Sequence, residues 1–377
     1  MKNFTPQLLP PNIKINAEDY IDELVEAYGA VKEYKTVLKY LRMDRDILLH
    51  ILYSREAVDS MNLVENKATV KEYFELSVEK NRNHEYLKEI QNYMDTLAKS
   101  KDLFSSLDFN ERLFNRIHYY LTEGYEEPFR KGSYRTESNQ VINKACDPTE
   151  GFMPPSAEKI DDLMKNFIEY LEANEDYHLL VKMAILHYQF ESIHPYDDGN
   201  GRMSRILFPI FVNKLGLMDN PNLFISEAIG RNRCLYYENL EQIRKNKNWV
   251  PWIKYFLKMI ETQAKMLMEF VLELERLYFQ DYEKVENIMF NKYIGSIYKS
   301  IYKNPVFTIN QIAQETGFNY QTVRKHLVTL EDDKIVSYNE SSKGRVYYYD
   351  NLIEILSTRQ LPEEPKAVES LEPYDIP

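Results

Sequence analysis

Cysteine and long apolar segments are both scarce in this chain, and each scarcity excludes a class of protein. The 377 residues include two cysteines, Cys146 and Cys234, which stand far apart and in no metal-ligand spacing. We therefore expect no disulfide scaffold, and a reducing cytoplasm fits this cysteine usage. Apolar runs such as residues 206–212 are too short to cross a bilayer, and the N-terminal residues lack the apolar core of a signal peptide. The chain is predicted to be cytoplasmic, with no membrane partner.

Positive charge is also in deficit. Lys and Arg number 47 against 59 Asp and Glu, which gives a formal net charge of −12. This balance argues against a general basic coat for nucleic acid or anionic membranes. Hydrophobic residues make up 44% of the chain, enough to build sizeable cores. At about 150 residues per domain, the length indicates two or three folding units.

Helical periodicity dominates the spacing of apolar residues along the sequence. Apolar residues recur every three or four positions, which predicts helices over 17–57, 68–98, 156–174, 177–193, 202–215, 225–245, 251–280 and 283–302. Residues 132–155 interrupt this pattern with a β-prone Gln-Val-Ile between turn residues. We interpret that segment as a hairpin or an extended flap. The predicted fold class is mainly α with a short β-hairpin.

The character of the chain changes near residue 303. A helix, a turn at Gly317, a second helix and two β-rich runs follow one another, an order typical of a winged helix-turn-helix. The acidic, proline-rich end is typical of disorder. The predicted parts are an N-terminal helical region, a helical core, a small α/β winged helix-turn-helix domain and a disordered tail, over residues 1–99, 100–282, 283–355 and 356–377.

The winged segment has two interpretations. The expected recognition helix, Asn319–Leu330, carries Gln321, Arg324, Lys325 and His326, which favours DNA binding. Residues 303–350, however, contain six Lys or Arg and six Asp or Glu. Phosphate contacts supply most non-specific DNA affinity, so a neutral module should bind DNA weakly. A protein partner or a dimer surface is the alternative.

One short segment concentrates chemistry: "HPYDDGNGRMSR" at residues 194–205. Pro195 disfavours helical geometry at the residue before it, so the preceding helix should end there. Gly199 and Gly201 permit a positive φ, and successive amides can then face one concavity. A helix that begins near Arg202 would turn its N-terminal amides toward the same cavity and favour an anion.

The side chains of this segment suit a nucleotide. Arg202 and Arg205 lie three positions apart, on roughly one face of a helix, and each can fork onto phosphate oxygens. Asp198 would be repelled by a phosphate unless a cation lay between them, which suggests a Mg²⁺ ligand. His194 titrates near neutrality and can act as a general base.

The segment also has plainer interpretations. Asp-Gly-Asn-Gly alone is an ordinary turn, and a histidine before proline is often structural. A calcium loop would need a glutamate several positions after the glycine, where this chain has arginines. The joint pattern favours a functional site over either of them.

The segment resembles the signature of the Fic family, His-Pro-Phe-x-Asp/Glu-Gly-Asn-Gly-Arg-x-x-Arg. Tyr196 stands where phenylalanine is usual, a mild change if its hydroxyl reaches a partner or solvent. The resemblance covers roughly residues 100–260 and implies a Fic-type helical core. It also implies a protein adenylyltransferase that moves AMP from ATP to a hydroxyl of a protein target, including its own.

The resemblance assigns roles to the charged residues of the signature. His194 would deprotonate the target hydroxyl, and Asp198 would hold Mg²⁺ against the α- and β-phosphates. Arg202 would bind on the β-phosphate side, and Arg205 would reach the γ-phosphate. Positioned donors and metal would stabilise the charge at phosphorus, where phosphoryl-type catalysis gains most of its advantage.

The resemblance extends to the rest of the cradle. The amides of Gly199, Asn200 and Gly201, with the Asn200 side chain, would line it. The segment "GSYRTESNQVI" resembles the hairpin that holds the target in extended form, with Val141 and Ile142 as a clamp.

A further resemblance concerns the adenine pocket. The segment "ISEAIGRNRCLYYENL" resembles the one that closes it, with Tyr236 and Tyr237 as walls. Two core tyrosines on a helix are the alternative.

Residues 54–70 resemble the regulatory helix of many Fic proteins, whose pattern is Ser/Thr-x-x-x-Glu-Gly/Asn. Glu65 with the asparagine after it matches the end, but Met61 occupies the hydroxyl position. Ser60 comes one residue early, and at about 100° per residue it is expected to turn away from that face. A Glu65 carboxylate entering the site would pair with Arg205 and repel the γ-phosphate, so we predict autoinhibition.

Other functions remain open. The same fold could use another nucleotide donor, or remove AMP from a modified protein with Glu65 positioning water. A nucleotide-sensing regulator that binds DNA is a third class, although a pure binder has no need of His194. The sequence selects neither the target, which needs a Ser, Thr or Tyr hydroxyl, nor an oligomeric state such as a homodimer.

Overall fold

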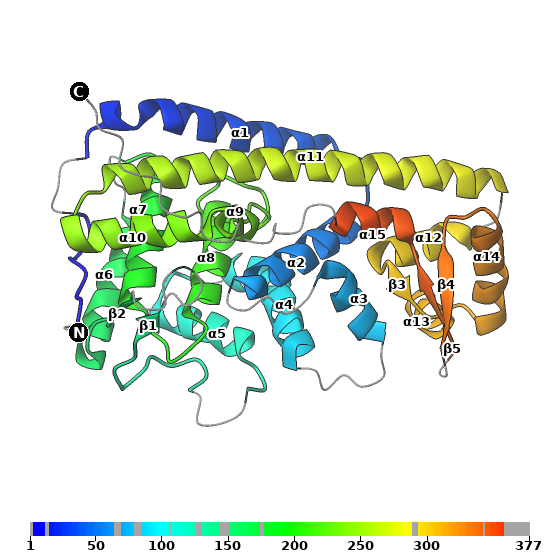
Figure 1. The fold of residues 1–377 in the computed structure, drawn as a ribbon, viewed down its shortest axis with the longest axis horizontal. Helices are drawn as coiled ribbons and strands as arrows, with labels where there is room; N and C mark the ends of the chain where they lie inside the picture. Colours follow the sequence, from blue (N-terminus) through cyan, green and yellow to red (C-terminus); the bar gives the residue numbers. More distant parts are fainter. Residues whose placement is uncertain are drawn as a thin grey trace.

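The computed structural model describes most of the chain. The described residues are 3–11, 15–63, 69–78, 85–105, 107–125, 130–142, 146, 151–173, 177–288, 293–341 and 344–357. Helices dominate them, and two small antiparallel sheets complete the fold (Figure 1). The predicted mainly-α class with a short hairpin is confirmed. Glu65 lies outside the described residues.

The N-terminal half contributes six helices to the description: α1 Ile21–Tyr40, α2 Arg45–Asn62, α3 Val70–Val78, α4 Glu85–Ser105, α5 Glu111–Leu121 and α6 Ile160–Glu172. The prediction of a single helix over 17–57 is wrong, because the helix is interrupted between the end of α1 at Tyr40 and the start of α2 at Arg45. Asp44 caps the second helix, since its carboxylate accepts the amide of Asp46 at 3.1 Å. The helix predicted over 68–98 is likewise divided into α3 and α4.

The central pair of helices positions the predicted site. Nearly all of α7, Leu179–Ile193, is buried, and so is most of α8, Asn200–Lys214. Two further helices, α9 Ser226–Arg231 and α10 Arg233–Asn246, lead into α11, Val250–Ile288, which runs beside α1 along one edge of the molecule (Figure 1). The Trp252 indole of α11 donates to the Ala184 carbonyl of α7 at 2.9 Å. The helices predicted over 251–280 and 283–302 correspond to α11 and to α12, Ile294–Lys303, which begins later than predicted.

The flap carries a two-stranded antiparallel sheet. Strand β1, Val141–Ile142, pairs with β2, Gly151–Phe152, in the register Val141 to Phe152. The predicted hairpin is therefore confirmed. Residues 143–145 and 147–150 lie outside the described part, but Cys146 between them is placed.

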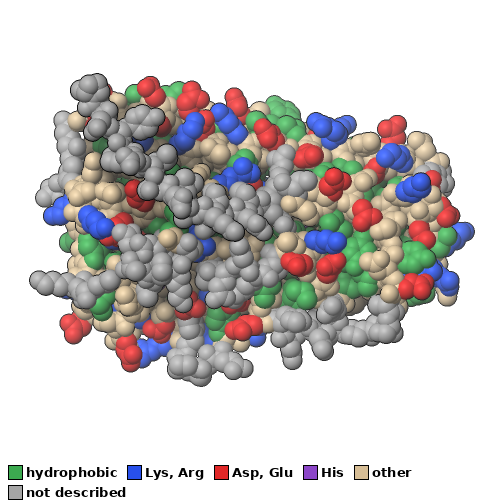
Figure 2. Space-filling view, viewed as in Figure 1, with side chains coloured by type: hydrophobic (Ala, Val, Ile, Leu, Met, Phe, Trp, Pro, Cys, Tyr) green, Lys and Arg blue, Asp and Glu red, His purple; other side chains and the backbone are tan. Residues whose placement is uncertain are grey.

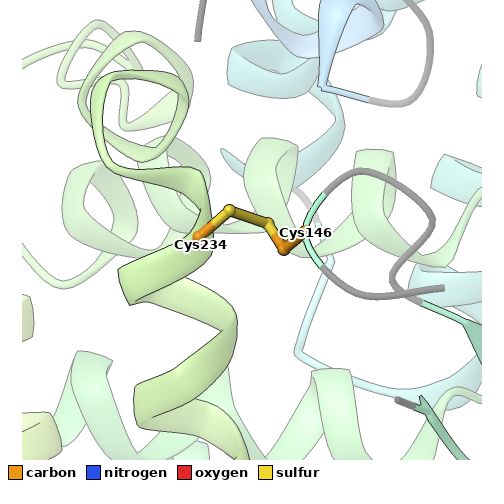
Figure 3. Close-up of a disulfide and its surroundings, with 2 residues drawn as sticks. All are labelled: Cys146 and Cys234. Carbon is orange, nitrogen blue, oxygen red and sulfur yellow. A yellow bond between two sulfur atoms is a disulfide. The ribbon is translucent and has the colours of Figure 1, made fainter. Parts of the chain in front are cut away.

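A disulfide joins Cys146 of the flap to Cys234 at the start of α10 (Figure 3). The Cα atoms are 5.4 Å apart although 88 residues separate the two cysteines in sequence. The expectation that this chain contains no disulfide is wrong. Distance along the chain does not report distance in space, and the flap folds back onto α10.

The C-terminal module, residues 294–357, consists of α12 Ile294–Lys303, β3 Val306–Phe307, α13 Ile309–Thr316, α14 Tyr320–Asp332, β4 Ser337–Ser341, β5 Gly344–Tyr348 and α15 Asp350–Ser357. Its strands pair antiparallel in the order β3-β5-β4. A capping box at Thr308 starts α13, and Gly317 at φ 71° ends it.

The C-terminal module packs on the rest of the molecule. Helix α12 contacts α2 and α11, α15 contacts α3 and α11, and β3 contacts α3. Of the residues expected on the recognition face, Gln321, Arg324 and Lys325 are exposed, whereas His326 is buried. The tail predicted from residue 356 begins inside α15, and residues 358–377 lie outside the described part.

Surface character agrees with a mixed charge balance. Lys and Arg side chains are interspersed with Asp and Glu on the face drawn in Figure 2. None of the helices among the described residues has the length and apolar character that a bilayer crossing needs.

Candidate active site

His194 stands where α7 ends. The helix runs to Ile193, and His194 adopts left-handed backbone angles, φ 50° and ψ 62°, as the C-cap before Pro195. The predicted helix stop is confirmed. Burial and, after it, the nearby Arg135 lower the pKa of the His194 imidazole to about 4, below the near-neutral value expected from the sequence. The ring is neutral at pH 7, and its buried Nδ1 has no hydrogen-bond partner among the described residues.

The loop after His194 makes a tight turn at Gly199. Gly199 takes φ 74°, and its amide donates to the Asp198 carboxylate at 2.6 Å. Helix α8 begins at Asn200, two residues earlier than predicted, so the first amides of the helix have no carbonyl partner inside it. Together with the helix dipole, those amides favour an anion.

Asn200 closes this loop. Its side-chain oxygen accepts the Tyr196 amide at 2.9 Å, and its side-chain nitrogen donates to the Tyr196 carbonyl at 2.8 Å. Both polar groups of the side chain are therefore turned into the loop. This differs from the prediction that the Asn200 side chain faces the phosphates, and it makes Asn200 a residue that shapes the cradle.

A histidine that sequence reasoning missed supports the loop from below. His118 of α5 accepts the Gly132 amide at Nδ1, 3.0 Å away, and its Nε2 lies 3.0 Å from the Asp198 carbonyl. Nδ1 therefore carries no proton, so Nε2–H donates to that carbonyl. The Tyr196 ring stacks on the imidazole at 3.8 Å between centroids, and its hydroxyl donates to Asn115 at 3.1 Å. Tyrosine in place of phenylalanine thus finds a partner.

Arg202 is buried and held by three groups. Its guanidinium bonds the Tyr125 hydroxyl and lies 3.5 Å from the Glu89 carboxylate and 3.4 Å from Asp198. The Tyr125 hydroxyl in turn donates to Glu89 at 2.7 Å. The charge is compensated before any phosphate arrives, so a phosphate would replace part of this network.

Arg205 is also buried, 5% exposed, and it contacts α2. Nε donates to the Ser60 hydroxyl at 2.8 Å, and a terminal nitrogen donates to the Ser60 carbonyl at 2.9 Å. Ser60 therefore faces the second arginine of the signature. Whether Ser60 also turns away from Glu65 stays a prediction, because Glu65 lies outside the described residues. A Cβ on Gly201 would come within 2.9 Å of the Arg205 guanidinium, so this position needs glycine while the arginine is held there.

Helix α2 contributes further buried charge. The Glu56 carboxylate accepts the Ser226 hydroxyl at 2.5 Å and the Tyr93 hydroxyl at 3.1 Å, and burial raises its pKa to about 7. Arg55 pairs with Glu227 of α9 at 2.6 Å. Sequence periodicity shows the apolar stripe of α2 and does not identify these polar contacts, whose partners come from other helices.

Asp198 fits a metal-ligand role. Its carboxylate is 65% exposed at the mouth of the anion loop, beside the start of α8. The described residues contain no group of three or more His, Cys, Asp or Glu side chains placed to hold a metal ion by themselves. One carboxylate completed by phosphates and water is the usual Mg²⁺ environment, and the donor set suits it.

The remaining predicted residues occupy two elements. Val141 is half-buried in β1, and Ile142 follows it in the same strand. Tyr236 of α10 is in the core: its hydroxyl meets His187 Nε2 at 2.8 Å, and its ring packs near Trp252. Tyr237 beside it is half-buried. The adenine-pocket role of the two tyrosines stays a prediction.

Comparison with known proteins supports this description. Residues 108–212 match a sequence profile of the Fic/DOC family. The chain is 23% identical over 243 residues to the protein adenylyltransferase Fic of Aedes aegypti, covering 62% of this chain and 44% of that protein. It is 34% identical over 110 residues to a probable protein adenylyltransferase of Aquifex aeolicus, covering 29% of this chain and 32% of that one. The chain spans less than half the length of these relatives.

Solved structures share the fold. A Fic family protein from Desulfovibrio desulfuricans aligns with a TM-score of 0.58 at 19% identity, over 90% of this chain and 98% of that chain. A Fic domain containing signaling protein from Bacteroides thetaiotaomicron aligns with a TM-score of 0.52 at 17% identity, over 67% and 97%. At these identities the likeness establishes the helical fold alone.

Proposed function

This chain belongs to the Fic family, and from that premise we propose that it transfers AMP from ATP to a hydroxyl side chain of a protein target. One observation carries the proposal. A neutral histidine at the end of α7 directly precedes a helix N-terminus that can bind phosphate, with two buried arginines in its first two turns. A base and an anion site joined by five residues suit a reaction in which a hydroxyl attacks a phosphate.

The chemistry balances as a substitution at the α-phosphorus. The target hydroxyl loses its proton to the neutral His194 imidazole, and its oxygen bonds to the α-phosphorus. The bond from that phosphorus to the bridging oxygen breaks, and pyrophosphate leaves. Amides at the start of α8 face the phosphates, and Arg202 and Arg205 bind the β- and γ-phosphate oxygens.

Asp198 would hold Mg²⁺ beside the nucleotide phosphates. When bound, the ion supplies positive charge that offsets the charge of the phosphates. One Asp198 oxygen accepts the Gly199 amide, and the other lies 3.4 Å from the Arg202 guanidinium, so a cation would share or replace that second contact. The bond from the Gly199 amide would hold the turn in place while the other Asp198 oxygen bound the cation.

The flap would present the target. Strand β1 is short, and a target segment that pairs with its free edge would be held by backbone hydrogen bonds. Such pairing orients a hydroxyl with little regard to sequence. Val141 and Ile142 would clamp the target residue from this strand, and Tyr236 and Tyr237 would border the adenine.

Autoinhibition is part of the proposal. Arg205 is held by Ser60 near the end of α2, and Glu65 follows Ser60 by five residues. A Glu65 carboxylate that reached Arg205 would compete there with the γ-phosphate. We expect Glu65→Gly to raise auto-AMPylation several-fold when purified protein is given labelled ATP. An unchanged rate would contradict the inhibitory role.

Intact-mass spectrometry tests the reaction itself. The purified chain is incubated with Mg²⁺ and each nucleoside triphosphate in turn, and we expect an AMP adduct with ATP. His194→Ala should abolish the adduct while ATP binding persists. The control is His178→Asn at the opposite end of α7, which keeps the helix cap and should leave transfer intact. An adduct from another nucleotide would reassign the donor, and loss of AMP from a modified protein would reverse the direction.

A further inference from the structure

Arg135 lies at the junction of the flap and the catalytic histidine. It is 2% exposed, and each hydrogen bond that its side chain makes among the described residues goes to a backbone carbonyl. The acceptors and distances are His194 at 2.9 Å, Glu137 at 2.9 Å, Pro155 at 2.6 Å and Ile193 at 3.5 Å. Its own amide donates to the Pro195 carbonyl at 2.9 Å.

These acceptors come from three places in the chain. Glu137 precedes the first strand of the flap, and Pro155 follows the second, so Arg135 holds both ends of the hairpin. Ile193 and His194 are the last carbonyls of α7, which have no partners within the helix. One guanidinium therefore connects the hairpin that is proposed to bind the target with the residue proposed to deprotonate it.

Burying this charge is expensive. None of the ion pairs between described residues includes Arg135, although Asp197 lies close enough to favour its charge. The compensation comes from carbonyl oxygens and from the negative end of the α7 dipole. A chain that needed only packing here could use an apolar side chain, so the arrangement indicates a role for the fork of donors.

The contacts bear directly on His194. Left-handed backbone angles are strained for a residue with a Cβ, so neighbouring bonds must hold them. Arg135 supplies two such bonds, one to the His194 carbonyl and one to the next carbonyl along the chain. Its charge also lowers the pKa of the imidazole, an effect shared with Arg244 of α10 and opposed by Asp198 of the loop.

We propose that Arg135 is the positioning residue of the catalytic base: it fixes the His194 backbone and ties it to both ends of the target-binding hairpin. This inference rests on the proposed AMP transfer. Arg135 itself touches neither nucleotide nor target. It acts through the direction of the imidazole and through the alignment of β1 with it.

Three variants of the full chain separate position from charge. Arg135→Lys keeps the charge but cannot reach several carbonyls at once. Arg135→Met removes both properties. Arg130→Met is the control, because Arg130 is exposed in the same segment. Thermal denaturation reports whether each variant folds.

The first readout is the rate of auto-AMPylation with labelled ATP and Mg²⁺ across pH. We expect the rate to fall about tenfold in Arg135→Lys and about a hundredfold in Arg135→Met. A displacement of the catalytic base by about an ångström can reduce the rate about a hundredfold. ATP affinity should stay within about threefold, since binding and positioning of the base are separate. A folded Arg135→Lys with the wild-type rate would overturn the proposal.

The second readout needs no reaction. Histidine ring signals are followed by NMR against pH, with the His194 signal assigned from His194→Ala. Arg135→Met should move the midpoint of His194 upward, because a cation that disfavours the imidazolium has gone. Arg135→Lys should leave the midpoint in place while the rate falls. If Arg135→Met leaves the midpoint unchanged, the proposal is wrong. If Arg135→Met does not fold, the Arg135→Lys arms decide. A wild-type chain that transfers no AMP would refute the proposed function, and this titration would still test the link between Arg135 and His194.

Discussion

The region around the candidate site and the C-terminal module differ in how many charged side chains they bury. Around the candidate site, the buried charged side chains include Arg55, Glu56, Asp59, Glu89, Arg135, Arg202, Arg205 and Glu227. In residues 294–341 and 344–357, the buried polar side chains are Ser300 and His326. Burying charge costs free energy, and a protein retains it where a site needs oriented donors. The candidate site therefore lies in the region with many buried charges, whereas the described core of the C-terminal module is largely apolar.

Tyrosines hold the C-terminal module in place. The Tyr302 hydroxyl donates to the Leu274 carbonyl at 2.6 Å, and the Tyr298 hydroxyl donates to the Tyr278 carbonyl at 2.9 Å. Tyr349 donates to the Asp281 carboxylate at 2.8 Å. Each bond reaches α11, so the module is docked on that helix by aromatic area with a polar anchor.

Acidification should produce the largest difference in stability between the two regions. Burial lowers the pKa of His118 to about 4 and that of His187 to about 3, against about 6.5 in an unfolded chain. The unfolded state therefore binds more protons, and the stabilisation present above pH 6.5 is lost as pH falls toward 4. Protonation of each histidine in the unfolded state should lower the free energy of unfolding by about 1.4 kcal/mol per pH unit in that window.

Hydrogen exchange at pH 7.5 and 5, corrected for intrinsic rates, measures this effect. Protection should fall more in α5 and α7, which carry these histidines, than in α13 and α14. Equal loss of protection in both regions would break the comparison.

The disulfide should stabilise the catalytic part alone. Replacing Cys146 and Cys234 by serine opens a loop of 88 residues, which the chain-entropy account values at about 4–5 kcal/mol of unfolding free energy. Denaturant unfolding of oxidised and reduced protein gives the difference, and the serine variant should match the reduced protein. Thiol titration of the native oxidised chain that found two free cysteines would contradict the pairing.

Removing the polar anchor should weaken the C-terminal module by a smaller amount. Tyr349→Phe leaves the buried Asp281 carboxylate with one acceptor site unfilled, which should cost about 1–3 kcal/mol. AMP transfer per folded molecule should stay at the wild-type rate. Tyr320→Phe, 44% exposed, is the matched control and should stay within about 0.5 kcal/mol.

The smallest effect is expected on the exposed face of α14. Alanine at Gln321, Arg324 and Lys325 together should leave unfolding free energy within about 0.5 kcal/mol per site and AMP transfer unchanged. Binding of wild type and variant to duplex DNA at low salt then tests the recognition-helix interpretation. A drop in AMP transfer would show that this face acts on the catalytic part.

Local patterns predicted much of the fold. Pro195 after His194 marked the end of α7, and apolar spacing marked most helices, because both effects act within a few residues. The break between α1 and α2 was missed, since apolar spacing continues across it and the Asp44 cap is a single side chain. The contact between Ser60 and Arg205 was not predicted, because an ideal helical face says nothing of where a long arginine on another helix can reach.

The sequence by itself determined the helical class, the hairpin and the run of residues from His194 to Arg205, whose chemistry is carried by neighbours in the chain. Tertiary structure decided what holds those residues. The Arg135 side chain reaches His194 across 59 positions, His118 reaches Asp198 across 80, and Arg205 reaches Ser60 across 145. Such contacts depend on how whole helices pack, and a pattern that repeats every few residues does not encode which distant side chains meet.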